Sequence, residues 1–169
     1  LGANGSGGNT PLGTTANGTV VASGGTLDLN GFNLSTAETY SLTGAGASGA
    51  GALANSHANT SVVTQAITLA ANATIAGNAG NITLNGTIAG ANNTLTLSGG
   101  TGGTVNSVLN TSIASLTKSG AGIWALAGGN TYTGGTRLEA GKLSLVYNST
   151  GIGTALNALG PSGLITFAG

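Results

Sequence analysis

Charged side chains are nearly absent from this sequence of 169 residues. Three basic and three acidic residues make up 4% of the chain and give a formal net charge of zero, whereas about 25% of the residues in an ordinary globular protein are charged. The basic residues are Lys118, Arg137 and Lys142. Because polyanions are bound by clustered Lys and Arg side chains, we expect no nucleic-acid partner and no anionic membrane surface as a partner.

Cysteine and long hydrophobic runs are also missing. Without cysteine the fold has no disulfide, and no thiol chemistry is available. No apolar run approaches the roughly 20 residues that a membrane-spanning helix needs, so we expect no membrane insertion of this segment. The sequence starts at Leu1 without a signal peptide, and we interpret it as a processed or excised piece of a longer protein.

The composition nevertheless predicts a folded chain. There are 33 glycines and two prolines, a fraction below the roughly 25–30% that is typical of low-complexity disorder. Hydrophobic residues make up 40% of the chain, whereas disorder usually combines low hydrophobicity with high net charge. The recurrent Thr, Val and Ile residues favour β-structure.

A short apolar–polar–apolar motif recurs along the chain and indicates strands with one apolar face. Its eight copies are Leu27–Leu29, Tyr40–Leu42, Ile67–Leu69, Ile82–Leu84, Leu95–Leu97, Trp124–Leu126, Leu143–Leu145 and Ile165–Phe167. The copies begin 13 to 29 residues apart, whereas a hairpin sandwich shows turn signals every 8–12 residues. The spacing fits a solenoid with about 20 residues per turn.

We therefore predict an all-β fold, a single parallel β-solenoid over residues 1–169 with little or no helix. Eight motifs suggest about eight rungs, which would make a rod about 40 Å long. Residues 44–60 are rich in Gly and Ala and lack a clean period, so we interpret them as a protruding loop or a loosened rung.

Residues 116–145 carry the most specific signal in the chain. The segment holds alternating residues at Ile123–Leu126 and Lys142–Leu145 around a polar turn with the sequence Gly-Gly-Asn-Thr-Tyr-Thr-Gly-Gly. It resembles the autotransporter-associated β-strand repeat of large bacterial surface and secreted proteins. The matching positions are Leu116, Lys118, Gly120, Gly122, Trp124, Leu126, Gly128, Asn130 through Thr136, Leu138, Ala140, Gly141, Leu143 and Leu145. The resemblance implies rungs of a right-handed parallel β-helix, usually part of a long stalk or passenger.

The ends of such a rod determine its partners. A rung buries its apolar face only when a neighbour stacks on it, and charge and proline, which usually block edge pairing, are scarce here. We therefore expect both terminal rungs to expose unpaired edges. The expected partners are further copies of the chain or neighbouring solenoid repeats, joined end to end, with glycans or a host surface as the alternative.

Two aromatic residues of the repeat-like segment invite a functional interpretation. Trp124 could stack on a sugar, but the alternation pairs it with Leu126 on the inward face, and we favour a core position. Tyr132 lies in the polar turn, where the resemblance implies a turn-packing role. Arg137 and Glu139 are two residues apart, which predicts an outward-facing surface ion pair with Leu138 pointing inward.

Enzyme chemistry finds little material in this sequence. Paired acid–base catalysis needs two carboxylates within reach, and the only carboxylates are Asp28, Glu38 and Glu139, spread along the chain. A Ser-His-Asp set built on His57 and Asp28 has no Gly-x-Ser-x-Gly elbow to place its serine. With one histidine and no cysteine, a zinc site is not expected. We predict no catalytic residue, no metal site and no cofactor.

The sequence therefore predicts a non-enzymatic structural β-solenoid of a bacterial cell-surface or secreted protein. It would serve as a stalk or as an extracellular filament that assembles rung to rung. The alternative is an adhesin module, in which the 44–60 segment or an outer polar face binds a glycan or a host receptor. Both interpretations place the chain outside the cell.

Overall fold

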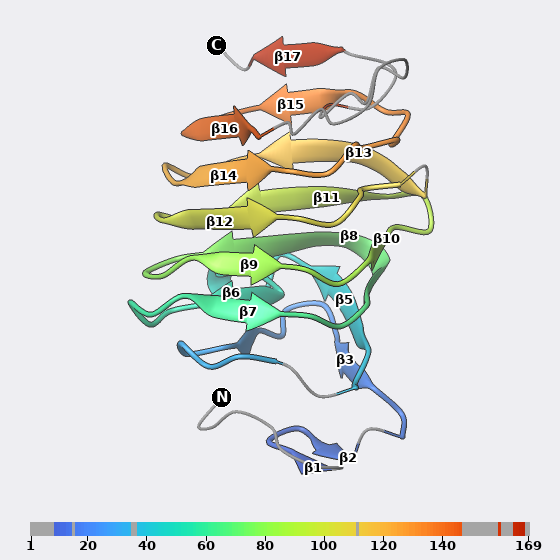
Figure 1. The fold of residues 1–169 in the computed structure, drawn as a ribbon, viewed down its shortest axis with the longest axis vertical. Coiled ribbons are helices and arrows are strands. Elements are labelled where there is room, and N and C mark those ends of the chain that lie inside the picture. Colours follow the sequence, from blue (N-terminus) through green and yellow to red (C-terminus); the bar gives the residue numbers. More distant parts are fainter. Residues whose placement is uncertain are drawn as a thin grey trace.

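The computed structural model describes residues 9–14, 16–34, 37–110, 112–146, 159 and 164–167. These residues form an all-β fold in which two parallel sheets face each other across a narrow interior (Figure 1). The only helical element among them is the 3-10 turn η1 (Ala47–Gly49). No helix in the described part of the chain has the length and apolar character required to cross a membrane.

The larger sheet has ten strands among the described residues, all paired in parallel. Its strands are β3 (Thr19–Val21), β4 (Leu27–Asp28), β5 (Tyr40–Gly44), β6 (Leu53–Asn55), β8 (Ile67–Gly77), β10 (Ile88–Ala89), β11 (Asn93–Ser98), β13 (Ile113–Lys118), β15 (Thr136–Leu138) and β17 (Ile165–Phe167). The smaller sheet has five: β7 (Ser61–Val63), β9 (Ile82–Leu84), β12 (Gly102–Val105), β14 (Ile123–Leu126) and β16 (Lys142–Leu145).

The chain climbs from one turn to the next with a constant step. Ile82 lies beside Gly103, which lies beside Trp124, so each position recurs after 21 residues. In Figure 1 the front strands run to the right and the rear strands to the left while the chain rises from the N-terminus, which makes the solenoid right-handed. The predicted right-handed parallel β-helix is confirmed.

The number of turns is smaller than the sequence predicted. The chain makes about six turns, not eight, because two of the motifs share a turn. Ile67 is stacked below Ile88, so the motifs beginning at Ile67 and Ile82 occupy two faces of the same 21-residue turn. Six turns spaced by roughly 4.8 Å give a stack about 29 Å long.

Inward side chains of successive turns stack into one continuous core. Buried members include Leu29, Leu34, Leu42, Leu53, Val63, Ile67, Leu69, Ile75, Ile82, Leu84, Leu95, Leu97, Val105, Leu109, Ile113, Leu116 and Leu126. The polar residue of each motif faces outward, as period two requires. Because each rung covers its neighbour, both backbone hydrogen bonding and apolar burial come from stacking.

Glycine is required at the corner between the two sheets. Gly99, Gly120 and Gly141 recur at 21-residue intervals, and each has a positive φ, between 69° and 103°. A side chain at Gly141 would place its Cβ 2.4 Å from the carbonyl oxygen of Gly120 in the turn below. The corners of successive turns are therefore too close for any other residue.

Residues 44–60 form part of the stack. They contain η1 and strand β6, which pairs with β4 and β8. The stretch from Ala52 to Asn55 is buried. Of the two interpretations drawn from the sequence, a protruding loop or a loosened rung, the structure agrees with the rung.

The two ends of the rod differ, whereas the sequence predicted open edges at both. An antiparallel hairpin of β1 (Asn9–Thr10) and β2 (Gly13–Thr14) lies below the first turn (Figure 1). Leu12, in the turn of this hairpin, packs against the hydrophobic core. The hairpin therefore covers the interior at the N-terminal end, and the prediction of an open N-terminal rung is wrong.

Candidate functional site

The repeat-like segment 116–145 contributes strands to both sheets. β13 and β15 lie in the larger sheet, β14 and β16 in the smaller one, and each is paired in parallel with its neighbours. The segment therefore supplies more than one turn of the rod. Its distinctive side chains were examined first, because they are where this segment departs from a plain aliphatic stack.

Lys118 occupies an inward position of the core. It lies in register between Leu97 of the turn below and Leu138 of the turn above, and its side chain is 0% exposed. The sequence had counted Lys118 among three basic residues available to a polyanion. Its burial leaves Arg137 and Lys142 as the exposed ones, which strengthens the argument against a polyanion partner.

The ammonium group of Lys118 is held by the backbone of two corners. Nζ donates hydrogen bonds to the carbonyl oxygens of Ser119 (2.6 Å) and Gly120 (2.8 Å) in its own turn, and of Ala140 (3.1 Å) in the next. Burial lowers the pKa of Lys118, while the three carbonyl acceptors favour its charged form. The side chain thus joins two successive corners of the rod.

Trp124 has a similar role one face further along the chain. Its side chain is fully buried, and Nε1 donates a hydrogen bond to the carbonyl oxygen of Ser98, at 2.8 Å. Ser98 and Ser119 are 21 residues apart and occupy equivalent corners, so Trp124 satisfies one and Lys118 the other. We call these two side chains the corner clamps. The predicted core position of Trp124 is confirmed.

The bulk of Trp124 is accommodated by a glycine. Gly103 is its in-register neighbour in the turn below, and a Cβ at Gly103 would come within 2.9 Å of Cζ3 of the indole ring. Leu143 covers the ring from the turn above. A small residue facing a large one maintains close packing in this stack.

The polar turn of the segment is also buried. Tyr132 is 0% exposed, and its hydroxyl is 2.6 Å from Oγ1 of Thr136. The side-chain oxygen of Asn130 accepts a hydrogen bond from the backbone N–H of Leu109, at 2.8 Å. Burial raises the pKa of Tyr132, opposed by the hydrogen bond from Thr136. The turn-packing role of Tyr132 is therefore confirmed.

Arg137 and Glu139 form the predicted surface ion pair. Nε of Arg137 lies 2.7 Å from Oε1 of Glu139, and both side chains are largely in solvent. Leu138, between them, is half-buried. Such exposed pairs contribute about 0–1 kcal/mol to stability, so the pair decorates the surface of the rod.

Asp28, Ser56 and His57 lie near one another at a corner of the N-terminal turns, but they do not form a catalytic triad. The carboxylate of Asp28 accepts hydrogen bonds from the Ser56 hydroxyl and from the backbone N–H groups of Ser56 and Asn30, the latter two at 3.0 Å. Nδ1 of His57 accepts from the backbone N–H of Asn59, at 3.1 Å. Histidine therefore makes neither of the two hydrogen bonds that a triad requires.

These contacts also determine the charge of Asp28. Burial of the carboxyl raises its pKa, but the hydrogen bonds from Ser56 and from the backbone outweigh burial, so the pKa lies below its usual value. The carboxylate remains ionised while it ties two turns of the corner together. Its chemistry is that of a structural acceptor.

Glu38 lies apart from this corner, next to the start of β5. Its side chain is buried, and it accepts a hydrogen bond from the hydroxyl of Thr19 on β3. Glu139 follows β15 near the other end of the rod. The structure therefore brings none of the three carboxylates into a shared site. Among the described residues, no group of three His, Cys, Asp or Glu side chains could hold a metal ion.

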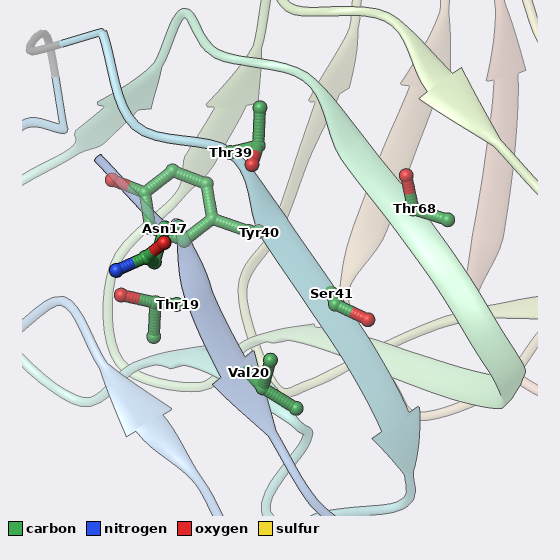
Figure 2. A pocket seen from close by; sticks show the side chains of 8 residues that line it. Asn17, Thr19, Val20, Thr39, Tyr40, Ser41 and Thr68 are labelled. Carbon is green, nitrogen blue, oxygen red and sulfur yellow. The ribbon is translucent and has the colours of Figure 1, made fainter. Parts of the chain in front are cut away.

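A shallow hollow of about 70 Å³ lies on the larger sheet near its N-terminal end. Figure 2 shows the ring of Tyr40 beside Asn17 and Thr19, with Ser41 and Thr68 on the neighbouring strands. Tyr40 is buried and its hydroxyl has no hydrogen-bond partner. Burial and the nearby Glu38 carboxylate raise the pKa of Tyr40 to about 12. The hollow brings together no nucleophile and base.

A larger cavity of about 200 Å³ opens at the C-terminal end of the interior. Its lining is apolar except for one threonine, and consists of Thr136, Leu138, Leu143, Leu145, Leu159, Ile165 and Phe167. These residues are the last members of the inward stacks. The cavity is therefore the open end of the core and contains no titratable side chain.

Sequence reasoning missed the two corner clamps. Alternation placed Lys118 in phase with Leu116, which was the available signal for an inward lysine, but its charge suggested solvent exposure. Gly103 could have been recognised as the small partner of Trp124 only once the 21-residue step was known. The covering hairpin at the N-terminal end had no alternating motif to announce it.

Comparison with known protein families identifies the segment that the sequence had singled out. Residues 116–145 match the family model described as passenger-associated-transport-repeat, in agreement with the resemblance to the autotransporter-associated repeat. Neither the curated proteins nor the solved structures provide a match to the chain. Secretion or surface exposure is the general setting of this repeat family. The thirty-residue match and the β-solenoid fold together support a structural segment of the passenger type.

Proposed function

We propose that this chain is a non-enzymatic structural segment that extends a secreted or surface-exposed bacterial protein as a rigid rod. The observation that carries the proposal is the use made of its unusual side chains. Lys118, Trp124 and Asp28 direct their polar groups to backbone atoms of neighbouring corners and turns. In an enzyme or a receptor, some of these groups would be held ready for a ligand.

The rod is proposed to act as a stalk. The hairpin that covers the N-terminal end of the interior favours a stalk over a filament in which the C-terminal rung of one copy stacks on the N-terminal rung of the next. The low charge and the two stacked parallel sheets suit an element whose role is length and resistance. Absence of catalysis, cofactors and metal ions is part of the proposal.

An extracellular display experiment tests this role. The chain would be fused between an export signal and a β-barrel anchor, next to a second fusion that carries Leu126→Asp. Because Leu126 is fully buried, an unpaired charge there costs several kcal/mol. We expect a protease-resistant rod at the surface only for the unchanged chain. Equal protease sensitivity of the two fusions would contradict a structural role.

An adhesin module is the second candidate, because the outer faces of both sheets are lined by Thr, Ser and Asn side chains. Deletion of residues 44–60 cannot test it, since β6 would be lost with them. A glycan array probed with the folded chain is the direct test. Binding of a defined sugar, abolished by a substitution of an exposed Ser or Thr, would replace the stalk proposal.

A further inference from the structure

The two ends of the rod present different surfaces, and the C-terminal one is apolar. Two inward stacks reach this end: the column that contains Leu126 finishes at Leu145, and the column that contains Lys118 finishes at Phe167. Leu126 is 0% exposed, whereas Leu145 is 48% and Phe167 is 70% exposed. The loss of burial from one turn to the next shows that these columns lack their covering side chains.

The backbone at this end has a matching gap. β16 is the last strand of the smaller sheet and, among the described residues, pairs only with β14. The N–H groups of Lys142 and Val146 donate to Gly122 and Leu126 of the turn below. Because successive N–H groups of a strand point to opposite edges, those of Leu143 and Leu145 point to the free edge.

We propose that the C-terminal end of the rod binds an extended strand of another polypeptide, in parallel with β16. This inference rests on the proposed structural function and specifies the partner. The bound strand would have apolar residues at alternate positions, so that two side chains enter the 200 Å³ cavity above Leu143 and Leu145. Its backbone would continue the smaller sheet, as in other cases of strand addition.

The geometry of the existing interfaces favours this occupant. Every pairing inside the smaller sheet is parallel and in register, with the inward residues directly stacked. A further parallel strand repeats that interface without any change in the rod. The N-terminal end of a second copy does not offer such a strand, because its hairpin and Leu12 lie over the first turn.

The chain itself provides a suitable probe. A capped peptide with the sequence of residues 80–86, Gly-Asn-Ile-Thr-Leu-Asn-Gly, has the pattern of β9, whose Ile82 and Leu84 are both fully buried. The control peptide, Gly-Asn-Thr-Ile-Leu-Asn-Gly, has the same composition with its two apolar residues adjacent. It therefore cannot direct both of them to one face of a strand.

Amide hydrogen exchange of the 169-residue chain, measured by NMR, is the test. At saturating peptide we expect the amides of Leu143 and Leu145 to exchange at least tenfold more slowly, while the control peptide has no effect. The variant Leu145→Asp should abolish this protection. Val108→Asp, at a site of similar exposure (46%) on the side of the rod, should retain it.

Three results would overturn the inference: no protection at the highest soluble peptide concentration, equal protection by both peptides, or a self-associated chain whose Leu143 and Leu145 amides are already protected. The same spectra separate this inference from the proposed function. Slow exchange of the buried strands β9, β12 and β14 without any peptide effect would leave the rod intact and refute only the strand-binding end.

Discussion

The buried ammonium of Lys118 gives the sharpest prediction for this rod. We consider Lys118→Met, which retains most of the volume in the column between Leu97 and Leu138 and removes the charge. The change abolishes three hydrogen bonds to the carbonyl oxygens of Ser119, Gly120 and Ala140. It also leaves these three acceptors in place without their donor.

The magnitude follows from two opposing effects. A hydrogen bond to a charged group contributes about 1.5–3 kcal/mol, and a buried acceptor that loses its partner costs about 1–3 kcal/mol. Removing the ammonium also relieves its desolvation, which is several kcal/mol for an ion in a protein interior. Because the carbonyls remain, we expect the loss to exceed the relief and leave a net destabilisation of about 2–4 kcal/mol.

Urea unfolding followed by circular dichroism is the assay. Lys142→Met is the matched control, because Lys142 lies on β16 with its side chain in solvent, and it should change the free energy of unfolding by less than about 0.5 kcal/mol. If Lys118→Met is as stable as the unchanged chain, Lys118 does not hold the corners together, and the account of the repeat segment fails.

Three further substitutions have expected outcomes that differ in sign. Tyr40→Phe should stabilise the chain by about 1 kcal/mol because it removes an unpartnered buried hydroxyl, whereas Tyr132→Phe should destabilise it by a similar amount, as measured by urea unfolding. Since the pKa of Tyr40 is raised to about 12 from 10, its stabilising effect is present below pH 10 and is lost as the pH rises to 12; thermal melts of Tyr40→Phe should lack this component. Gly103→Ala should lower the melting temperature and expose Trp124 to fluorescence quenching, because its Cβ would lie 2.1 Å from a backbone oxygen. The Asp28 carboxyl, whose pKa is lowered in the fold, stabilises it above about pH 3.8 and loses this effect in more acidic solution, so acid melts of Asp28→Asn should show a weaker pH dependence.

Each of these predictions has an outcome that contradicts it. Equal effects of the two tyrosine substitutions would show that the hydroxyl of Tyr40 is not unpartnered. An unchanged melting temperature for Gly103→Ala would contradict the close stacking of the smaller sheet. A variant with asparagine at position 28 that loses stability in acid as steeply as the unchanged chain would assign the acid sensitivity to other groups.

Much of the fold was predictable because period two is a local signal. The alternation at Ile82–Leu84 or Trp124–Leu126 determines which side chains face inward, whatever the rest of the chain does. The match of residues 116–145 to a passenger repeat provided the parallel, right-handed arrangement. Handedness and strand order are long-range properties, and alternation alone could not have supplied them.

The errors have physical causes too. Counting motifs gave eight rungs because the strands of two faces look alike in sequence, and only their pairing shows that Ile67 and Ile82 share a turn. Lysine is rarely buried, so Lys118 was interpreted from its charge, although its phase matched the core. The hairpin over the N-terminal end consists of two-residue strands, which are too short to leave a periodic pattern.

The central claim is a parallel, in-register stack with a step of 21 residues, and a chain without cysteine allows it to be measured directly. Thr83 and Thr104 are outward-facing neighbours in adjacent turns of the smaller sheet, at the spacing of about 4.8 Å between strands that lies within the range of a disulfide. The account predicts that Thr83→Cys/Thr104→Cys forms an intramolecular disulfide under mild oxidation, while Thr83→Cys/Ala125→Cys, two turns apart, does not. Efficient cross-linking of the second pair, or none of the first, would contradict the stack and the structural role built on it.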